Sequence, residues 1–300
     1  MICPWAYNVG MIEQIDLNPS CNFLEAPLSG ETIKLRSWGQ FQGAQGVALL
    51  VHGLGAHSAW FEAEARELAK RGFFVLAYDH CGFGNRRRRP FKSYKQWIDD
   101  LAAVLAFVSA KFTGLPLYLM GNSMGALVVM ATSQIVKVSG IVIFSPGFDG
   151  HPKAFTPAYK ISSVLSAIFA PQRPVSLPYG FELVSRDSSV REWLEKDEEK
   201  RVAVPGSMLF ELLKLSQHVL ANLKATAVPV LMITAGQDRI VNNELNGKLF
   251  ARLNAPSKKH VHLPEAWHDL MFDPQLDEVA DEISLWHSEL GKPCTLIRQS

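Results

Sequence analysis

The stretch Leu117-Tyr118-Leu119-Met120-Gly121-Asn122-Ser123-Met124-Gly125 decides the fold that we expect for this chain. Residues 117–120 form a strand-sized apolar run, and residues 126–137 follow with a helical pattern. Gly-x-Ser-x-Gly between a strand and a helix is typical of a sharp turn whose glycines leave the serine hydroxyl exposed. We therefore predict that Ser123 is a nucleophile. The alternative is a Gly-rich turn with a capping serine.

Apolar runs of the same size recur on both sides of this stretch. They occupy residues 47–51, 73–78, 141–144, 229–234 and 259–263, and helical patterns occupy residues 59–70, 97–112, 126–137, 244–253 and 276–290. Unbroken apolar strands that alternate with helices predict an α/β fold with a mostly parallel central sheet and helices on both faces. Residues 22–26 and 32–38 predict an antiparallel hairpin at its edge.

The alternation stops in the middle of the chain. Residues 148–228 contain Pro152, Pro157, Pro171, Pro174, Pro178 and Pro205. Helical patterns there cover only residues 161–169 and 208–223. We therefore expect a core of residues 1–147 and 229–300, interrupted by an insertion of residues 148–228.

A nucleophilic serine needs an imidazole base, which a carboxylate orients. His268 lies in the loop after the last predicted strand, whereas His52, His260, His262 and His287 have positions that favour structural roles. Two carboxylates compete as the orienting group, because Asp149 and Asp238 each follow a predicted strand. The tight polar turn around Asp238 favours that residue.

The charge that develops on an attacked carbonyl oxygen needs backbone N–H donors. The amide of Met124, directly after the serine, is one candidate. Leu54, in His52-Gly53-Leu54-Gly55 after the first central strand, offers the second.

These motifs resemble the α/β-hydrolase fold and, within it, the monoacylglycerol lipase and lysophospholipase-like branch that is grouped with serine aminopeptidases. The resemblance runs from about residue 22 to residue 290 and rests on residues 52–58, 78–84, 119–125, 236–241 and 266–268. It implies a triad of Ser123, Asp238 and His268, an oxyanion hole from Leu54 and Met124, and cleavage of lipid-like carboxylic esters through an acyl-serine intermediate.

The resemblance also assigns the middle segment. It implies that residues 148–228 form a cap whose helix at residues 161–169 admits an acyl chain and can rest on a membrane. Ile161, Leu165 and Ile168 would then contact the substrate. The same apolar face could instead pack the cap onto the core.

The chain departs from the family pattern at several positions. Ala56, Asn122 and Ala126 stand where the family often has Glu, His and Gly. Arg86, Arg87, Arg88 and Arg89 follow Asp79-x-x-Gly-x-Gly, where Ser and acidic residues are usual. The arginines could bind a phosphate headgroup or an anionic membrane surface, or they could form a solvated loop.

Composition excludes several classes of protein. The 30 basic and 29 acidic residues nearly cancel, so no global field recruits nucleic acid. Cys3, Cys21, Cys81 and Cys294 are widely spaced, which favours reduced thiols. No metal or dinucleotide motif occurs, and we expect no cofactor. The start of the chain lacks a secretory pattern and no apolar run reaches about 20 residues, so we expect a cytoplasmic protein with at most peripheral membrane contact.

Other activities are compatible with the same triad. A thioesterase would use it unchanged, and an aminopeptidase would need acids such as those at residues 195–199 to hold a substrate amine. A ligand-binding protein of this fold without turnover is a further alternative. The oligomeric state has no signature in the sequence.

Overall fold

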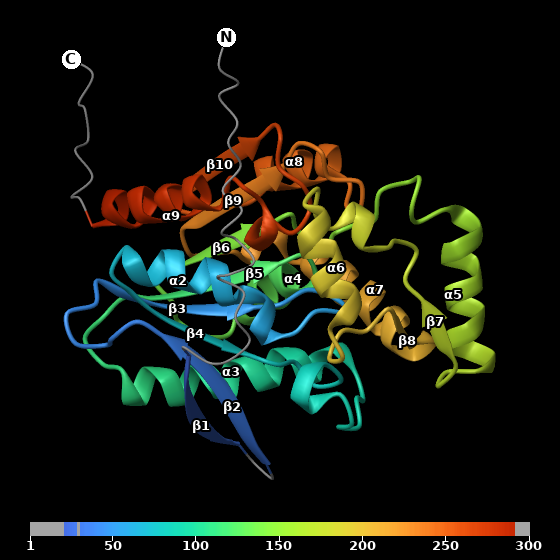
Figure 1. Cartoon of the computed structure of the whole chain (residues 1–300), viewed down its shortest axis with the longest axis horizontal. Coiled ribbons are helices and arrows are strands. Elements are labelled where there is room, and N and C mark those ends of the chain that lie inside the picture. The colour runs from blue at the N-terminus through green and yellow to red at the C-terminus, as the bar shows by residue number, and fades with distance from the viewer. Residues whose placement is uncertain (1–20, 29–30, 292–300) are drawn as a thin grey trace.

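The computed structural model describes residues 21–28 and 31–291, which contain an eight-stranded sheet between helices (Figure 1). The strands lie in the order β1-β2-β4-β3-β5-β6-β9-β10. Their bounds are β1 (Asn22–Leu28), β2 (Glu31–Trp38), β3 (Gly46–Val51), β4 (Phe73–Tyr78), β5 (Leu117–Asn122), β6 (Gly140–Phe144), β9 (Val230–Ala235) and β10 (Lys258–Leu263).

The strand pairing is mostly parallel, as the sequence predicts. Neighbouring strands pair in parallel along the series β4-β3-β5-β6-β9-β10. At the other edge, β1 pairs with β2 and β2 pairs with β4 antiparallel. Every residue of β3, β4, β6 and β9 is buried, which explains their unbroken apolar character. The edge strand β10 alternates instead, because one of its faces meets solvent.

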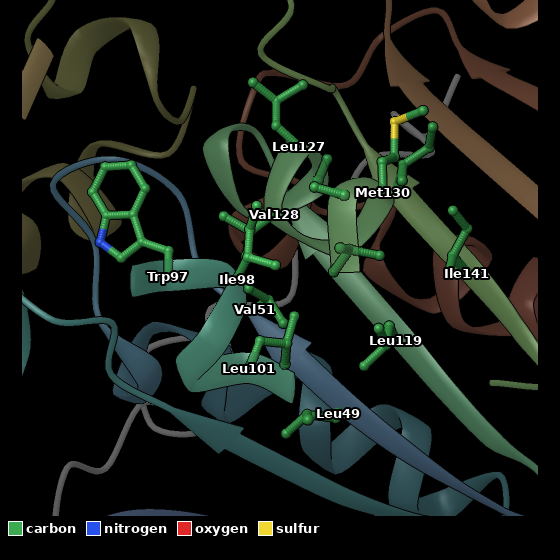
Figure 2. Close-up of a cluster of buried hydrophobic side chains, with 14 of the residues drawn as sticks. Leu49, Val51, Trp97, Ile98, Leu101, Leu119, Leu127, Val128, Met130 and Ile141 are labelled. Carbon is green, nitrogen blue, oxygen red and sulfur yellow. The ribbon is translucent and has the colours of Figure 1, made fainter. Parts of the chain in front are cut away.

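Helices cover both faces of the sheet. One apolar core lies under α2 (Glu62–Lys70) and α9 (Leu276–Leu290). The other lies under α3 (Tyr94–Lys111), α4 (Met124–Thr132) and α8 (Asn243–Ala251). Figure 2 shows side chains of this second core, which come from β3 (Leu49 and Val51), β5 (Leu119), α3 (Trp97) and α4 (Val128). The central strands are therefore held from both sides at the level of the β5–α4 turn.

The segment between β6 and β9 carries its own elements. They are α5 (Pro157–Phe169), β7 (Pro174–Ser176), η3 (Phe181–Leu183), α6 (Ser188–Lys196), β8 (Ala203–Pro205), α7 (Gly206–Ala221) and η4 (Leu223–Ala225). Strands β7 and β8 form a separate antiparallel pair. Figure 1 shows α5, β7 and β8 to one side of the main sheet.

Several helices differ from the sequence prediction, and α3 and α5 begin at Tyr94 and Pro157 rather than at residues 97 and 161. Helix α6 was not predicted, because it is short and charged and buries only Val190 and Leu194. Residues 59–61 belong to a 3-10 turn, η1 (Ser58–Phe61), before α2 begins. Helix α4 ends at Thr132 rather than at residue 137. Just after that end, the Ser133 hydroxyl donates to the Met130 carbonyl, which a longer helix would need as a backbone acceptor.

The structure also bears on the cysteines and on the absence of a membrane-spanning run expected from the sequence. Cys21 and Cys81 are buried free thiols, and Cys3 and Cys294 lie outside the described residues. No helix within residues 21–28 and 31–291 combines the length and the apolar character that a membrane crossing requires.

The four arginines at residues 86–89 do not form one basic patch. Arg86 is 4% exposed and makes ion pairs with Glu31 and, at 2.8 Å, with Asp100. Its guanidinium also donates to the carbonyl of Asp79. Arg89 pairs with Glu31 at 3.1 Å, whereas Arg87 and Arg88 are exposed. Arg86 therefore joins β2, α3 and the loop after β4, and is unavailable to a headgroup.

We predict that Arg86→Ala destabilises the fold by about 3–5 kcal/mol, because it removes the ion-pair partner of the largely buried Asp100 and leaves Glu31 only the exposed Arg89. Arg88→Ala, at an exposed position two residues away, should change the free energy of unfolding by less than about 0.5 kcal/mol. Urea denaturation of both variants measures the difference. Equal stabilities would show that Arg86 has no structural role.

Candidate active site

Ser123 lies alone between the end of β5 and the start of α4, in a conformation that non-glycine residues rarely adopt. Its φ is 53° and its ψ is −113°. A backbone of this kind costs about 1–3 kcal/mol unless its surroundings impose it. The N–H of Ser123 donates to Phe144 at 2.9 Å, and its carbonyl accepts from Gly147 at 3.1 Å and Ala126 at 3.2 Å. Together these three bonds offset strain of that size.

The two glycines of the motif allow this turn to form. A Cβ on Gly125 would lie 2.0 Å from the carbonyl oxygen of Val51, and one on Gly121 would lie 2.4 Å from the carbonyl oxygen of Gly125. Neither contact can be relieved by a side-chain rotation, because the opposing atoms belong to the backbone. Helix α4 can therefore approach β3 this closely only with glycine at both positions.

The loops after β9 and β10 bring an acid and a histidine together. His268 Nδ1 donates to Asp238 Oδ2 at 2.7 Å, and the side chains are 4% and 0% exposed. The other oxygen, Asp238 Oδ1, accepts from the backbone N–H groups of Ile240 and Val241 at 2.8 and 3.0 Å. Asp238 is thus fixed in its turn and orients the imidazole.

The rival acid lies elsewhere. Asp149 Oδ1 pairs with Lys160 Nζ at 2.7 Å, and its side chain is 43% exposed. The structure therefore brings Asp238, and not Asp149, to His268.

The environment of His268 favours its charged form. Burial opposes the imidazolium, but the charge and hydrogen bond of Asp238, with a contribution from Asp269, outweigh burial and raise the pKa of His268 to about 9. Burial has the opposite outcome at His52 and His80, whose pKa values it lowers. Burial lowers the pKa of His52 to about 4, and its ring contacts the Gly53 carbonyl and the His80 N–H.

Ser123 and His268 line one cavity of about 50 Å³, together with Leu54, Asn122 and Asp269. Among the described residues no hydrogen bond joins the serine hydroxyl to the imidazole, as is common for such pairs without a substrate. The arrangement nonetheless places the hydroxyl of Ser123 at the same cavity as the imidazole that Asp238 orients.

The amides expected to stabilise an oxyanion lie beside the same serine. Leu54 and Met124 both line a larger cavity of about 190 Å³ that also reaches Ser123. Met124 begins helix α4, so its N–H lies at the positive end of the helix dipole. Arg201, in the insertion segment, donates its backbone N–H to Gly55 at 2.8 Å and holds the loop that carries Leu54.

The larger cavity is mainly apolar and lies between the core and the insertion segment. Its apolar walls come from loops near the serine and from α5 and α7: Phe148, Phe155, Val164, Leu209, Phe210, Leu212, Leu213, Ile240 and Val241. Ser123 borders both this cavity and the smaller one.

The three helix residues expected to contact substrate lie outside both cavities. Ile161, Leu165 and Ile168 are 61%, 48% and 62% exposed and line neither. The face of α5 that lines the larger cavity instead carries Tyr159 and Val164. A helical wheel identifies an apolar stripe but cannot say which side of the helix meets the core.

Other lining residues have no sequence signal. Tyr179 borders both cavities, and Val184 borders the smaller one. Both belong to irregular parts of residues 148–228, where no periodic pattern predicts direction. Only the tertiary structure places them beside Ser123.

The strand order, the turn at Ser123 and the paired His268 and Asp238 define a protein of the α/β-hydrolase class. A soluble variant of monoglyceride lipase from Saccharomyces cerevisiae, solved with a substrate analog, has this fold, with a TM-score of 0.82 and 18% identity over 97% of this chain and 100% of that one. The profile of the family described as "Serine aminopeptidase, S33" matches residues 42–275. The chain belongs to this family, which confirms the resemblance inferred from its motifs.

Two curated relatives indicate the range of activities in the family. A monoacylglycerol lipase of Mycolicibacterium smegmatis is 24% identical over 269 residues, 87% of this chain and 94% of that protein. Phospholipase YtpA of Bacillus subtilis is 24% identical over 239 residues, 78% of this chain and 91% of that protein.

We predict that Gly125→Ala destabilises the protein by about 3 kcal/mol or more, because its methyl group would overlap the Val51 carbonyl. Gly247→Ala is the matched control. Nothing lies within 4 Å of a Cβ at that helical position, so alanine should stabilise by about 0.5–1 kcal/mol. Thermal melts of both variants test the contrast, and similar melting temperatures would contradict the close-approach argument.

Proposed function

We propose that this protein hydrolyses carboxylic esters of lipid-like substrates, such as monoacylglycerols, lysophospholipids or short acyl esters, through an acyl intermediate on Ser123. The observation that carries the proposal is the position of Ser123 between a large apolar cavity and a small cavity that contains His268. The first fits an acyl chain, and the second fits the alcohol that leaves. The curated relatives, a monoacylglycerol lipase and a phospholipase, support this class of substrate.

The side chains would divide the reaction as follows. His268 takes the proton of the Ser123 hydroxyl as the oxygen attacks the ester carbonyl, and Asp238 stabilises the resulting imidazolium. The Leu54 and Met124 amides donate to the oxyanion. His268 then protonates the leaving alcohol, and afterwards activates the water that releases the fatty acid.

In this proposal residues 148–228 act as a cap. Helices α5 and α7 supply much of the apolar wall of the larger cavity. They would exclude water from the acyl chain and select for lipid-like substrates. Most of the proposed binding energy is therefore apolar burial, about 25 cal/mol per Å².

A peptidase reading has less support from the site. Asp197 accepts hydrogen bonds from His57 Nε2 and Trp60 Nε1, both at 2.8 Å. Glu199 lies 3.6 Å from His57 Nδ1. None of the acids at residues 195–199 lines either cavity, so they are not placed to hold the amine of a peptide bound at Ser123.

We predict that Ser123→Ala lowers the turnover of monoolein and of p-nitrophenyl butyrate by at least about 10⁴-fold, because the nucleophile is lost. The wild-type protein should also react with a fluorophosphonate probe, and the variant should not. Ser133→Ala, which changes a serine at the far end of α4, should leave both readouts unchanged. Ester turnover by Ser123→Ala, or a folded wild-type protein inert to the probe, would overturn the proposal and favour a ligand-binding role.

The exposed side of α5 suggests how the protein meets its substrate. Ile161, Leu165, Ile168 and Phe169 form one stripe, and Phe169 is 80% exposed. We propose that this stripe rests on the surface of a lipid aggregate, beside the cavity whose wall the same helix forms.

We predict that Ile161→Ser with Phe169→Ser weakens cosedimentation with phosphatidylcholine vesicles by at least about tenfold, since burying each side chain contributes about 1.5–3 kcal/mol. Leu285→Ser is the control, because Leu285 is 54% exposed but belongs to α9. Vesicle binding that is equally strong in all variants would rule out this surface.

A further inference from the structure

A side-chain hydrogen bond links the two neighbours of the reacting residues. Asn122 directly precedes Ser123, and Asp269 directly follows His268. Asn122 Nδ2 donates to Asp269 Oδ1 at 2.5 Å, across 147 positions of the chain. Asn122 is 1% exposed and Asp269 is 6% exposed, so water does not compete for this bond.

Asp269 also lies close to the reactive side of the imidazole. Its Oδ1 is 4.0 Å from His268 Nε2, whereas Asp238 Oδ2 is 2.7 Å from Nδ1. The ring thus lies between two carboxyl groups. Asn122, Ser123, His268 and Asp269 all line the smaller cavity. Opposite charges at 4–6 Å in a buried site act strongly on each other.

Other titratable groups face Asp269 from neighbouring elements. Glu64 comes from α2, Tyr179 from the insertion segment and Asp238 from the loop after β9. Burial, helped by Asp269, raises the pKa of Glu64 to about 8, so Glu64 is neutral in the acidic and neutral range. Burial also raises the pKa of Asp269, while His268 and the Asn122 hydrogen bond oppose this and favour its ionised form.

These contacts carry an inference that rests on the proposed function. We propose that Asp269, held by Asn122, is a positioning residue that acts through His268: it ties the base to the nucleophile turn and stabilises the imidazolium formed when Ser123 loses its proton. It does not touch the reacting bond in this role.

The proposal has a defined consequence for pH dependence. His268 acts as a base only when neutral, so kcat/KM should rise with pH up to the pKa of about 9. Asp269 favours the charged ring. Removing its charge should therefore move the rising limb to lower pH and, because the imidazolium of the transition state loses a partner, lower the plateau.

We predict that Asp269→Asn shifts the rising limb of kcat/KM for p-nitrophenyl butyrate down by at least about one pH unit and lowers the plateau by about tenfold or more. A parallel readout that needs no turnover is the NMR titration of the His268 ring, which should shift in the same direction. Glu265→Gln removes an exposed acid from the same loop and should leave both profiles unchanged.

Asn122→Ala provides a second variant in which Asp269 keeps its carboxyl group but loses its donor. The limb should move in the same direction, and Asn122→Ala combined with Asp269→Asn should shift it no further than Asp269→Asn alone. A uniform loss of activity with an unmoved limb and an unmoved ring titration would reduce the pair to a structural contact and overturn the inference. An inert wild-type protein whose ring titration still shifts in Asp269→Asn would overturn the proposed function alone.

Discussion

The close approach of helix α4 to strand β3 is the constraint on which the site depends. At Gly125 the helix lies so near the Val51 carbonyl that even a methyl group would overlap it. The approach forces the chain to turn within one residue after β5, and that residue is Ser123. The hydroxyl therefore projects from the sheet edge and not into the core. Its strain persists because Phe144, at the end of β6, accepts the hydrogen bond of its N–H and Gly147, in the loop after β6, donates to its carbonyl.

The parallel sheet explains why the remaining groups are nearby. Strands β3, β5, β9 and β10 all end at the same edge, so the loops with Leu54, Ser123, Asp238 and His268 meet there. These loops are short and are bonded to each other: Gln237 donates its N–H to the carbonyl of Ala266 at 2.9 Å. A sheet that places an acid and a base on adjacent strands needs little further ordering to join them.

The segment between β6 and β9 lines both cavities at Ser123. Its helices α5 and α7 enclose an apolar space on one side of Ser123, and Arg201 fixes the loop of Leu54 on the other. The small cavity is different in character, since Asn122, His268 and Asp269 give it a polar wall. A large apolar chamber and a smaller chamber with one polar wall thus meet at Ser123. Burial also controls the charge state of His268. Because the site is shielded from water, the charges of Asp238 and Asp269 act strongly on the imidazole and raise its pKa.

The sequence by itself determined the α/β architecture, the place of the turn at Ser123 and the candidate acid and base, because strand burial and glycine geometry leave local patterns. It could not determine which face of a helix meets the core or which distant side chains contact each other. The sequence favours substrate contact for the stripe of Ile161, Leu165 and Ile168, whereas in the structure the stripe is exposed and Val164 lines the larger cavity. Arg86 looked like part of a basic run and proved to be a buried ion pair. The bond between Asn122 and Asp269 had no signal at all, since it joins residues 147 positions apart. Which face of a helix is covered, and which distant groups meet, depend on how the layers pack, and packing is decided only when the whole chain folds.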